Sequence, residues 1–86
     1  MTTDLHGKIA LVTGSTSGIG LGIARILASV GVDIALNGFG DAEAIDALCE
    51  DISATNGVRV IHDGADMSKP DEIESMMKRV AGDFGT

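Results

Sequence analysis

The sequence contains no tyrosine and no tryptophan, and phenylalanine occurs only twice among its 86 residues. Hydrophobic residues nevertheless make up 44% of the chain, so the core must be built from Ile, Leu, Val, Ala and Met. This composition favours an α/β domain over an aromatic-rich β-sandwich. A chain of 86 residues allows one small domain, because at this size only a little over roughly 60% of the unfolded surface can be buried.

Basic residues and cysteine are also scarce. Six Lys and Arg stand against 13 Asp and Glu, which gives a net charge of −7. Phosphate backbones and anionic membranes repel a chain of this sign, so we expect neither a nucleic-acid nor a membrane partner. The single cysteine excludes an internal disulfide and fits a reducing compartment. No apolar run approaches the roughly 18 residues of a membrane span, and no signal peptide is visible. We therefore expect a cytoplasmic protein.

Short apolar runs alternate with longer amphipathic segments along the whole chain. The apolar runs, typical of buried parallel strands, lie at 8–13, 33–37 and 58–62. The predicted helices span 18–30 and 41–55, and a third begins near Ser68. Since crossovers between parallel strands are right-handed, this β-α-β-α-β-α pattern requires a parallel sheet. We predict the N-terminal part of a Rossmann-like, doubly wound α/β fold with strand order 3-2-1.

Apolar residues at helical spacing predict which face of each helix is buried. The stripe predicted for the first helix comprises Ile19, Ile23, Ile26, Leu27 and Val30. The stripe predicted for the third helix comprises Ile73, Met76, Met77 and Val80. Ser68 is the predicted N-cap of the third helix, with Pro70 in its first turn. We expect the first two helices to cover one face of the sheet and the third helix to cover the other.

The most informative segment is Leu-Val-Thr-Gly-Ser-Thr-Ser-Gly-Ile-Gly at residues 11–20, an apolar strand that runs into a glycine-rich turn and a helix. Glycine lacks a Cβ, so such a turn lets phosphates approach the backbone N–H groups at the helix N-terminus. The Gly-Lys-Ser/Thr sequence of a P-loop NTPase is absent, and so is the Gly-x-Gly-x-x-Gly spacing. The turn predicts a site for a dinucleotide pyrophosphate. A turn that serves packing alone is the alternative.

The motif Thr-Gly-x-x-x-Gly-Ile-Gly at residues 13–20 is similar to the glycine fingerprint of the short-chain dehydrogenase/reductase family. Within that family, Leu-Asn-Gly-Phe-Gly-Asp at 36–41 resembles the branch that acts on short 3-hydroxy acids. The resemblance covers essentially the whole chain. It implies NAD-dependent oxidation of a small-molecule substrate, (R)-3-hydroxybutyrate, to acetoacetate by a cytoplasmic homotetramer.

The resemblance also implies roles for individual residues. Backbone N–H groups and hydroxyls of the glycine turn would bond the pyrophosphate and the adenosine ribose. Phe39 would lie beside the adenosine, and Asp66 and Met67 would contact the adenine. For Asp66, the alternative is a turn residue that leads into the third helix. The implied cofactor-binding residues are Thr13, Gly14, Ser15, Ser17, Gly18, Ile19, Gly20, Phe39, Asp66 and Met67.

The end of the second predicted strand departs from the usual pattern of this family. Related NAD enzymes carry there an acidic residue that binds the ribose 2′-hydroxyl, whereas this chain has Gly38, Phe39 and Gly40, with Asp41 further on. No Lys or Arg lies in the glycine turn or just after that strand to neutralise a 2′-phosphate. This absence, together with the resemblance, favours NAD over NADP.

The catalytic groups of the family are missing from the sequence. They are a Tyr acid/base within Tyr-x-x-x-Lys, a Ser and an Asn, and a chain without tyrosine cannot carry the first motif. We therefore expect residues 1–86 to be the NAD-binding part of one Rossmann-type domain, truncated before the catalytic half and inactive alone. We expect no catalytic residue and no metal site. Another family member, such as a 3-oxoacyl reductase, and a non-catalytic dinucleotide-binding module are the alternatives.

Overall fold

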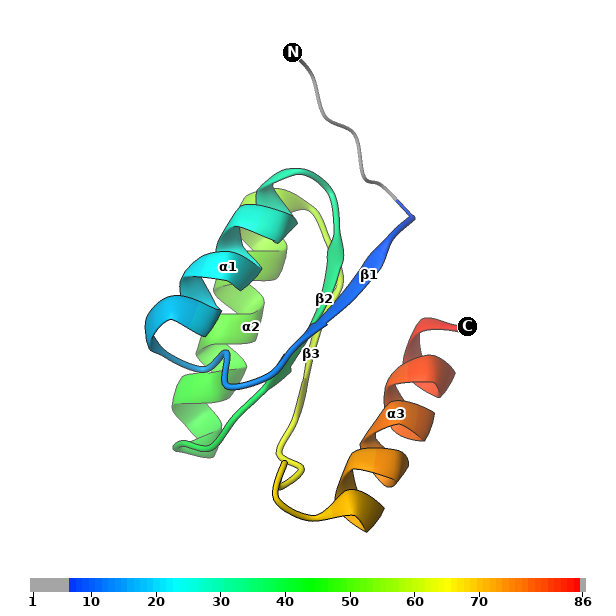
Figure 1. The fold of residues 1–86 in the computed structure, drawn as a ribbon. Helices are drawn as coiled ribbons and strands as arrows, with labels where there is room; N and C mark the ends of the chain where they lie inside the picture. The colour runs from blue at the N-terminus through cyan, green and yellow to red at the C-terminus, as the bar shows by residue number, and fades with distance from the viewer. Residues whose placement is uncertain (1–6, 86) are drawn as a thin grey trace.

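The computed structural model describes residues 7–85, which form a three-stranded parallel sheet with helices on both faces (Figure 1). The elements in chain order are β1 (Ile9–Val12), α1 (Gly18–Ser29), β2 (Asp33–Asn37), α2 (Ala42–Asn56), β3 (Val60–Asp63) and α3 (Pro70–Phe84). β2 lies between β1 and β3 and pairs in parallel with both. This is the predicted order 3-2-1 read from the opposite edge, so the predicted fold class is confirmed.

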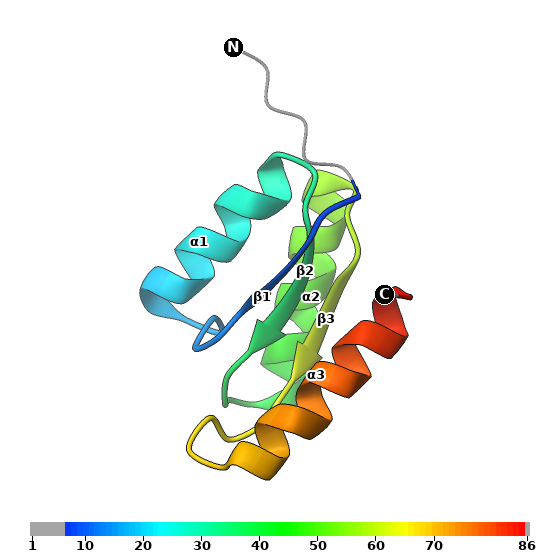
Figure 2. The same cartoon turned by 45° about the vertical axis from the view of Figure 1, so that its right-hand side comes forward.

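The register of the sheet brings the carboxyl ends of the three strands together. Val12 pairs with Leu36, and Asn37 pairs with Asp63. The loops that follow the strands therefore meet at one end of the sheet, the end toward which the arrowheads point in Figure 2. Ligands of open parallel sheets bind at this end.

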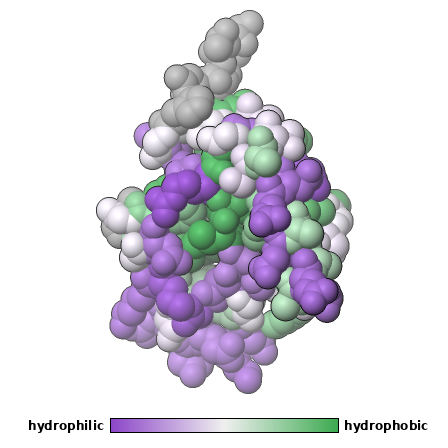
Figure 3. Space-filling view, turned by 180° about the vertical axis from the view of Figure 1, so that it is seen from behind, coloured by the Kyte–Doolittle hydropathy of each residue, from purple (hydrophilic) through white to green (hydrophobic). Residues whose placement is uncertain are grey.

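Each face of the sheet has its own apolar core, because successive side chains of a strand point to opposite faces. As predicted, α1 and α2 cover one face and α3 covers the other (Figure 1). The buried residues under α1 and α2 are Ala24, Ala28, Val32, Ile34, Leu36, Ile52 and Val58. Those under α3 are Ala35, Ala65, Met76 and Val80. Seen from behind, apolar side chains lie in a hollow framed by hydrophilic ones (Figure 3), so the cover of the sheet is incomplete there.

α1 packs through a different face from the one predicted. The exposed isoleucines are Ile19, Ile23 and Ile26, at 85%, 48% and 67%. Ala24 and Ala28 are buried instead, and their small side chains let the helix lie close to the sheet. α1 carries apolar residues around most of its circumference, so periodicity alone did not fix which side faces the core. Of the predicted stripe, the residues that pack against the core are Leu27 and Val30.

The start of α3 also differs from the prediction. Lys69, not Ser68, is the N-cap residue, and Pro70 is the first residue of the helix. The Ser68 hydroxyl donates to Asp66 Oδ1 at 2.7 Å, which removes it from the helix end. Proline at the first position is favourable because that residue needs no N–H partner. Met77, predicted to be buried, is 51% exposed, whereas the other predicted methionine of the stripe is buried.

Two kinds of feature are absent from the part of the chain that the structure describes. No helix in residues 7–85 has both the length and the apolar composition of a membrane span. Within the same residues, no three His, Cys, Asp or Glu side chains gather in a group that could hold a metal ion.

Candidate functional site

The turn between β1 and α1 lies open at the carboxyl end of the sheet. Gly14 and Gly18 have φ angles of 58° and 63°, in the left-handed region that favours glycine. A Cβ on either residue would meet nothing within 4 Å, so no side chain fills the space beside them. Gly20 is different, because a Cβ there would overlap the backbone carbonyl of Gly14. Glycine at position 20 therefore lets the helix approach the turn closely.

The first turn of α1 has no side-chain cap. Ser17 is the N-cap residue, but its hydroxyl accepts no bond from the helix, and no acidic residue lies in the first turn. The first N–H groups of a helix lack intrahelical acceptors, and the helix dipole gives this end a partial positive charge. α2 differs because Asp41 Oδ2 accepts the Ala44 N–H at 3.1 Å. The open turn and the uncapped end of α1 together form a cradle for an anion.

Ser15 is a buried polar residue that fixes the shape of the turn. Its hydroxyl donates to the carbonyl of Val12 at 2.6 Å and accepts the N–H of Asn37 at 3.0 Å. Its own N–H donates to the carbonyl of Asn37 at 2.6 Å. The predicted cofactor-binding Ser15 thus lies inside the fold with its hydroxyl bonded to the backbone. A direct bond from this hydroxyl to a cofactor stays a prediction.

The side chain of Asn37 joins the ends of all three strands. Its Oδ1 accepts the N–H of Gly14 at 3.4 Å, and its Nδ2 donates to the carbonyls of Asp63 and Ala65 at 3.0 and 3.1 Å. The residue is 2% exposed, and a buried amide with these bonds rigidifies its surroundings. Asn37 was not predicted from the sequence. The available signal was an amide at the end of an otherwise apolar strand.

Asp66 and Met67 lie in the loop between β3 and α3. Asp66 Oδ1 accepts the hydroxyl and the N–H of Ser68 at 2.7 and 2.9 Å. These two bonds, and then the charge of Lys69, hold the pKa of Asp66 below its usual value. The carboxylate is therefore an ionised acceptor in a turn that leads into α3, which was the alternative interpretation. Met67 packs against the core under α3. Contact of this pair with adenine stays a prediction.

The loop after β2 lies between the glycine turn and the end of β3. Phe39 is 70% exposed in this loop. Thr16 Oγ1 donates to the carbonyl of Phe39 at 3.0 Å, and His62 Nε2 lies 2.8 Å from the carbonyl oxygen of Gly38. The structure thus brings the predicted turn and Phe39 together. Thr16 and His62 were not predicted from the sequence, because their partners lie 23 and 24 residues away along the chain.

Residues 8–86 match the family model described as short chain dehydrogenase. The chain belongs to this family. It is 60% identical over 81 residues to a D-beta-hydroxybutyrate dehydrogenase of Cupriavidus necator, a match that covers 94% of this chain and 31% of the relative. An enzyme of the same description from Rhizobium meliloti is 50% identical over 78 residues, 91% of this chain and 30% of the relative.

Solved structures that are similar to this chain share its fold. One is the L-sorbose reductase of Gluconobacter frateurii complexed with NADPH and L-sorbose, with a TM-score of 0.87 and 32% identity over 99% of this chain and 32% of that chain. The chain spans about a third of the length of the curated relatives that it matches.

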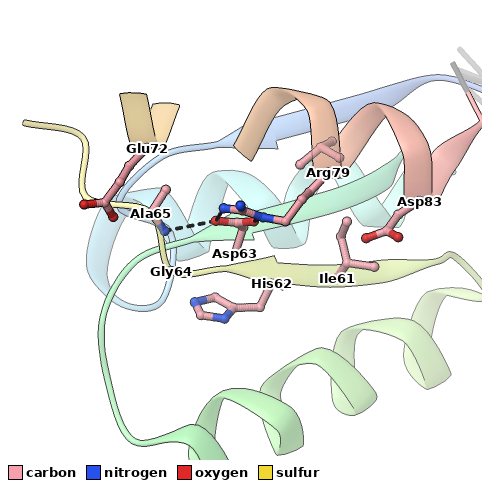
Figure 4. Close-up of a pocket in the computed structure, with 9 residues that line it drawn as sticks. Ile61, His62, Asp63, Gly64, Ala65, Glu72, Arg79 and Asp83 are labelled. Carbon is pink, nitrogen blue, oxygen red and sulfur yellow. Dashed lines mark hydrogen bonds and ion pairs between the residues drawn. The ribbon is translucent and has the colours of Figure 1, made fainter. Parts of the chain in front are cut away.

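A hollow of about 410 Å³ lies between the end of β3 and α3 (Figure 4). Arg79 crosses it and donates two bonds to Asp63, at 2.6 and 2.9 Å. The bond from Arg79 lowers the pKa of Asp63, and Asp63 raises the pKa of Arg79. These charges neutralise each other, and the Asp63–Arg79 pair fastens α3 to β3.

Cys49 is the single thiol of the chain, and the structure gives it a packing role. It is partly buried on α2 and packs against the core under α1 and α2. Burial first, and then the charge of Asp46, raise the pKa of the thiol. A thiol held in its neutral form is a poor nucleophile, which agrees with the packing role of Cys49.

Proposed function

We propose that residues 1–86 form the NAD-binding part of a single Rossmann-type domain, in an enzyme that oxidises (R)-3-hydroxybutyrate to acetoacetate. The observation that carries the cofactor half is the cradle formed by the open glycine turn and the uncapped N-terminus of α1. The substrate half rests on similarity to the two D-beta-hydroxybutyrate dehydrogenases. Assembly as a homotetramer in the cytoplasm is part of the same proposal and rests on the same resemblance.

The chain has a net charge of −7, so its overall charge repels a pyrophosphate and only local groups can hold one. The cradle supplies such groups. The backbone N–H groups of Gly18, Ile19 and Gly20 are the proposed donors, helped by the positive end of the helix dipole. The hydroxyls of Thr13 and Ser17, both on exposed residues of the turn, are the proposed ribose and phosphate partners. Bound NAD supplies the hydride acceptor. The residues of this chain bind and orient it.

The choice of NAD over NADP rests on charge. A 2′-phosphate needs a basic partner, and residues 13–20 and 36–41 contain no Lys or Arg. Asp41, at the start of α2, adds a carboxylate close to the loop that holds Phe39. The similar L-sorbose reductase structure is complexed with NADPH, so the fold alone does not select NAD. We propose NAD, with Phe39 beside the adenosine.

The adenine end of the cofactor is assigned to the loop after β3. Ser68 uses only Oδ1 of Asp66, and the described residues place no donor on Oδ2. An ionised Oδ2 is a suitable acceptor for the adenine amino group. Met67 would supply apolar contact to the ring.

The test is a cofactor and substrate assay of the polypeptide that carries this sequence, expressed at the length that its gene encodes. NADH formation would be followed with the (R) and (S) forms of 3-hydroxybutyrate, each with NAD and with NADP. We expect oxidation of the (R) form with NAD. A 3-oxoacyl thioester with NADPH is the comparison substrate. Reduction of that thioester without oxidation of the free hydroxy acid would overturn the proposed substrate and favour a 3-oxoacyl reductase.

A further inference from the structure

The loop at residues 38–40 contains two glycines on either side of Phe39. Glycine has the largest backbone freedom of any residue, so such a loop keeps one conformation only if other groups hold it. The Phe39 side chain is 70% exposed and gives the loop little anchorage. The position of this loop therefore depends on bonds to its backbone.

The first bond comes from the glycine turn. Thr16 Oγ1 donates to the carbonyl of Phe39 at 3.0 Å. A Cβ built on Gly38 would lie only 2.5 Å from the same Oγ1 atom, so the Thr16 side chain occupies the space beside Gly38. Thr16 thus ties the loop after β2 to the turn that we propose binds the pyrophosphate.

The second bond comes from the end of β3. His62 Nε2 lies 2.8 Å from the carbonyl oxygen of Gly38, and since a carbonyl only accepts, the imidazole donates. His62 is one of the residues that line the hollow, and Figure 4 shows its ring on the opposite side of β3 from Arg79. Among the described residues, Asp63 bonds to Arg79 and the His62 ring bonds to the loop.

We propose that Thr16 and His62 are positioning residues that hold the 38–40 loop and thereby select NAD against NADP. This inference rests on the proposed function. In sheets of this kind the adenosine ribose binds at the end of the second strand, where this chain lacks the usual acidic residue. Discrimination then depends on where the loop backbone lies. A loop held at two consecutive carbonyls cannot withdraw to make room for a 2′-phosphate, and no basic residue of the loop compensates the added charge.

The experiment compares NAD with NADP in the complete polypeptide, in steady-state kinetics and in binding of ADP-ribose and 2′-phospho-ADP-ribose. Thr16→Val keeps the shape of the side chain and removes the donor, and His62→Leu removes the imidazole. We expect each to raise the KM for NAD about 3- to 10-fold, the range that follows from losing one hydrogen bond. The KM for NADP should change less, so the preference for NAD falls, and the effect should lie in KM more than in kcat.

The controls separate positioning from general stability. Thr16→Ser and His62→Gln retain a donor and should restore most of the NAD preference. Thr55→Val makes the same chemical change on the exposed side of α2 and should leave the preference unaltered. If Thr16→Val does not fold, Gly38→Ala displaces the loop from Thr16 instead, and the same fall in preference is expected.

Two results would overturn the inference, and only the second would also overturn the proposed function. If the unmodified protein prefers ADP-ribose and the variants keep that preference within about 2-fold, a change smaller than the loss of one hydrogen bond, the inference alone fails. If the unmodified protein binds neither nucleotide, the proposed function fails and the inference fails with it.

Discussion

The two faces of the sheet are closed by different kinds of interaction. Under α1 and α2, the side chains of Ile34, Leu36 and Ile52 are completely buried. Under α3 the apolar cluster is smaller, and charged groups add to it. Arg79 pairs with Asp63 through two bonds. On the first face the ion pair of Arg25 with Asp51 joins α1 to α2 and burial holds these helices on the sheet, whereas on the other face an ion pair joins α3 to the sheet itself.

A second arginine, Arg59, also contacts α3. Arg59 donates to the backbone carbonyl of Asp83 near the end of α3, and its guanidinium carbon lies 4.9 Å from the centre of the Phe84 ring. Such cation–π contacts contribute about 0.5–1 kcal/mol at exposed sites. Both arginines lie outside the glycine turn. Arg59 and Arg79 therefore both help to hold α3 in place.

The largest loss of stability is expected on the α1 and α2 face. Ile52→Ala removes a fully buried side chain and should lower the free energy of unfolding by about 2–5 kcal/mol. Ile26→Ala is the matched control, since Ile26 is 67% exposed, and it should change stability by less than about 0.5 kcal/mol. Urea unfolding of the complete polypeptide measures both. Equal losses would mean that the exposed stripe of α1 is covered in the protein.

Substitution of Asn37 should give the next largest loss of stability, because its buried amide bonds to the backbone after β1 and at the end of β3. Asn37→Ala leaves the N–H of Gly14 and two carbonyls without their partner, and we expect a loss of about 2–3 kcal/mol. Asn56→Ala is the control. Its amide bonds only the carbonyl of Ile52 at a helix end, so about 1 kcal/mol is expected. If the two variants unfold at the same denaturant concentration, the role assigned to Asn37 is wrong.

The smallest effect is expected at the ion pair of the α3 face. Arg79→Met should lower the free energy of unfolding at neutral pH by less than either Ile52→Ala or Asn37→Ala, because solvent screens an ion pair whose arginine side chain is 55% exposed. Arg79 lowers the pKa of Asp63 from 3.8 in the folded chain. A folded-state pKa below the unfolded value means that the stabilisation is present above about pH 4 and is lost as the pH falls through the folded value.

Unfolding of the unmodified protein and of Arg79→Met at pH 7 and in acid tests this dependence. We expect the difference between the two proteins to shrink in acid. A difference that stays constant with pH would show that Asp63 is not the partner through which Arg79 stabilises the fold.

Much of the fold could be predicted from the sequence. β2 has the predicted bounds, and α2 starts and ends one residue later than predicted. These elements have clear signals, since β2 is a short apolar run and α2 is amphipathic. The predicted buried face of α1 was wrong because both alanines and isoleucines repeat at helical spacing. Only packing against the sheet determines that the alanines are the buried set.

The site was predictable only where its pattern is local in the sequence. The glycine turn is local in sequence, so its pattern identified it. Asn37, Thr16 and His62 act through backbone groups that lie 22 or more residues away. No local pattern encodes such partners, because the register of the sheet brings them together. The same reason explains why Ser15, predicted to face a cofactor, has its hydroxyl bonded inside the fold.

The central claim is that the open turn at residues 14–20 receives the pyrophosphate of NAD. Calorimetric titration of NAD into the Gly20→Ala and Gly22→Ala variants of the complete polypeptide tests this claim most directly. A Cβ at Gly20 overlaps the carbonyl of Gly14, whereas a Cβ at Gly22 meets nothing within 4 Å. We predict that Gly20→Ala weakens NAD binding by at least about 10-fold, equivalent to about 1.4 kcal/mol, while Gly22→Ala binds as the unmodified protein does. Equal binding by the two variants would contradict the account.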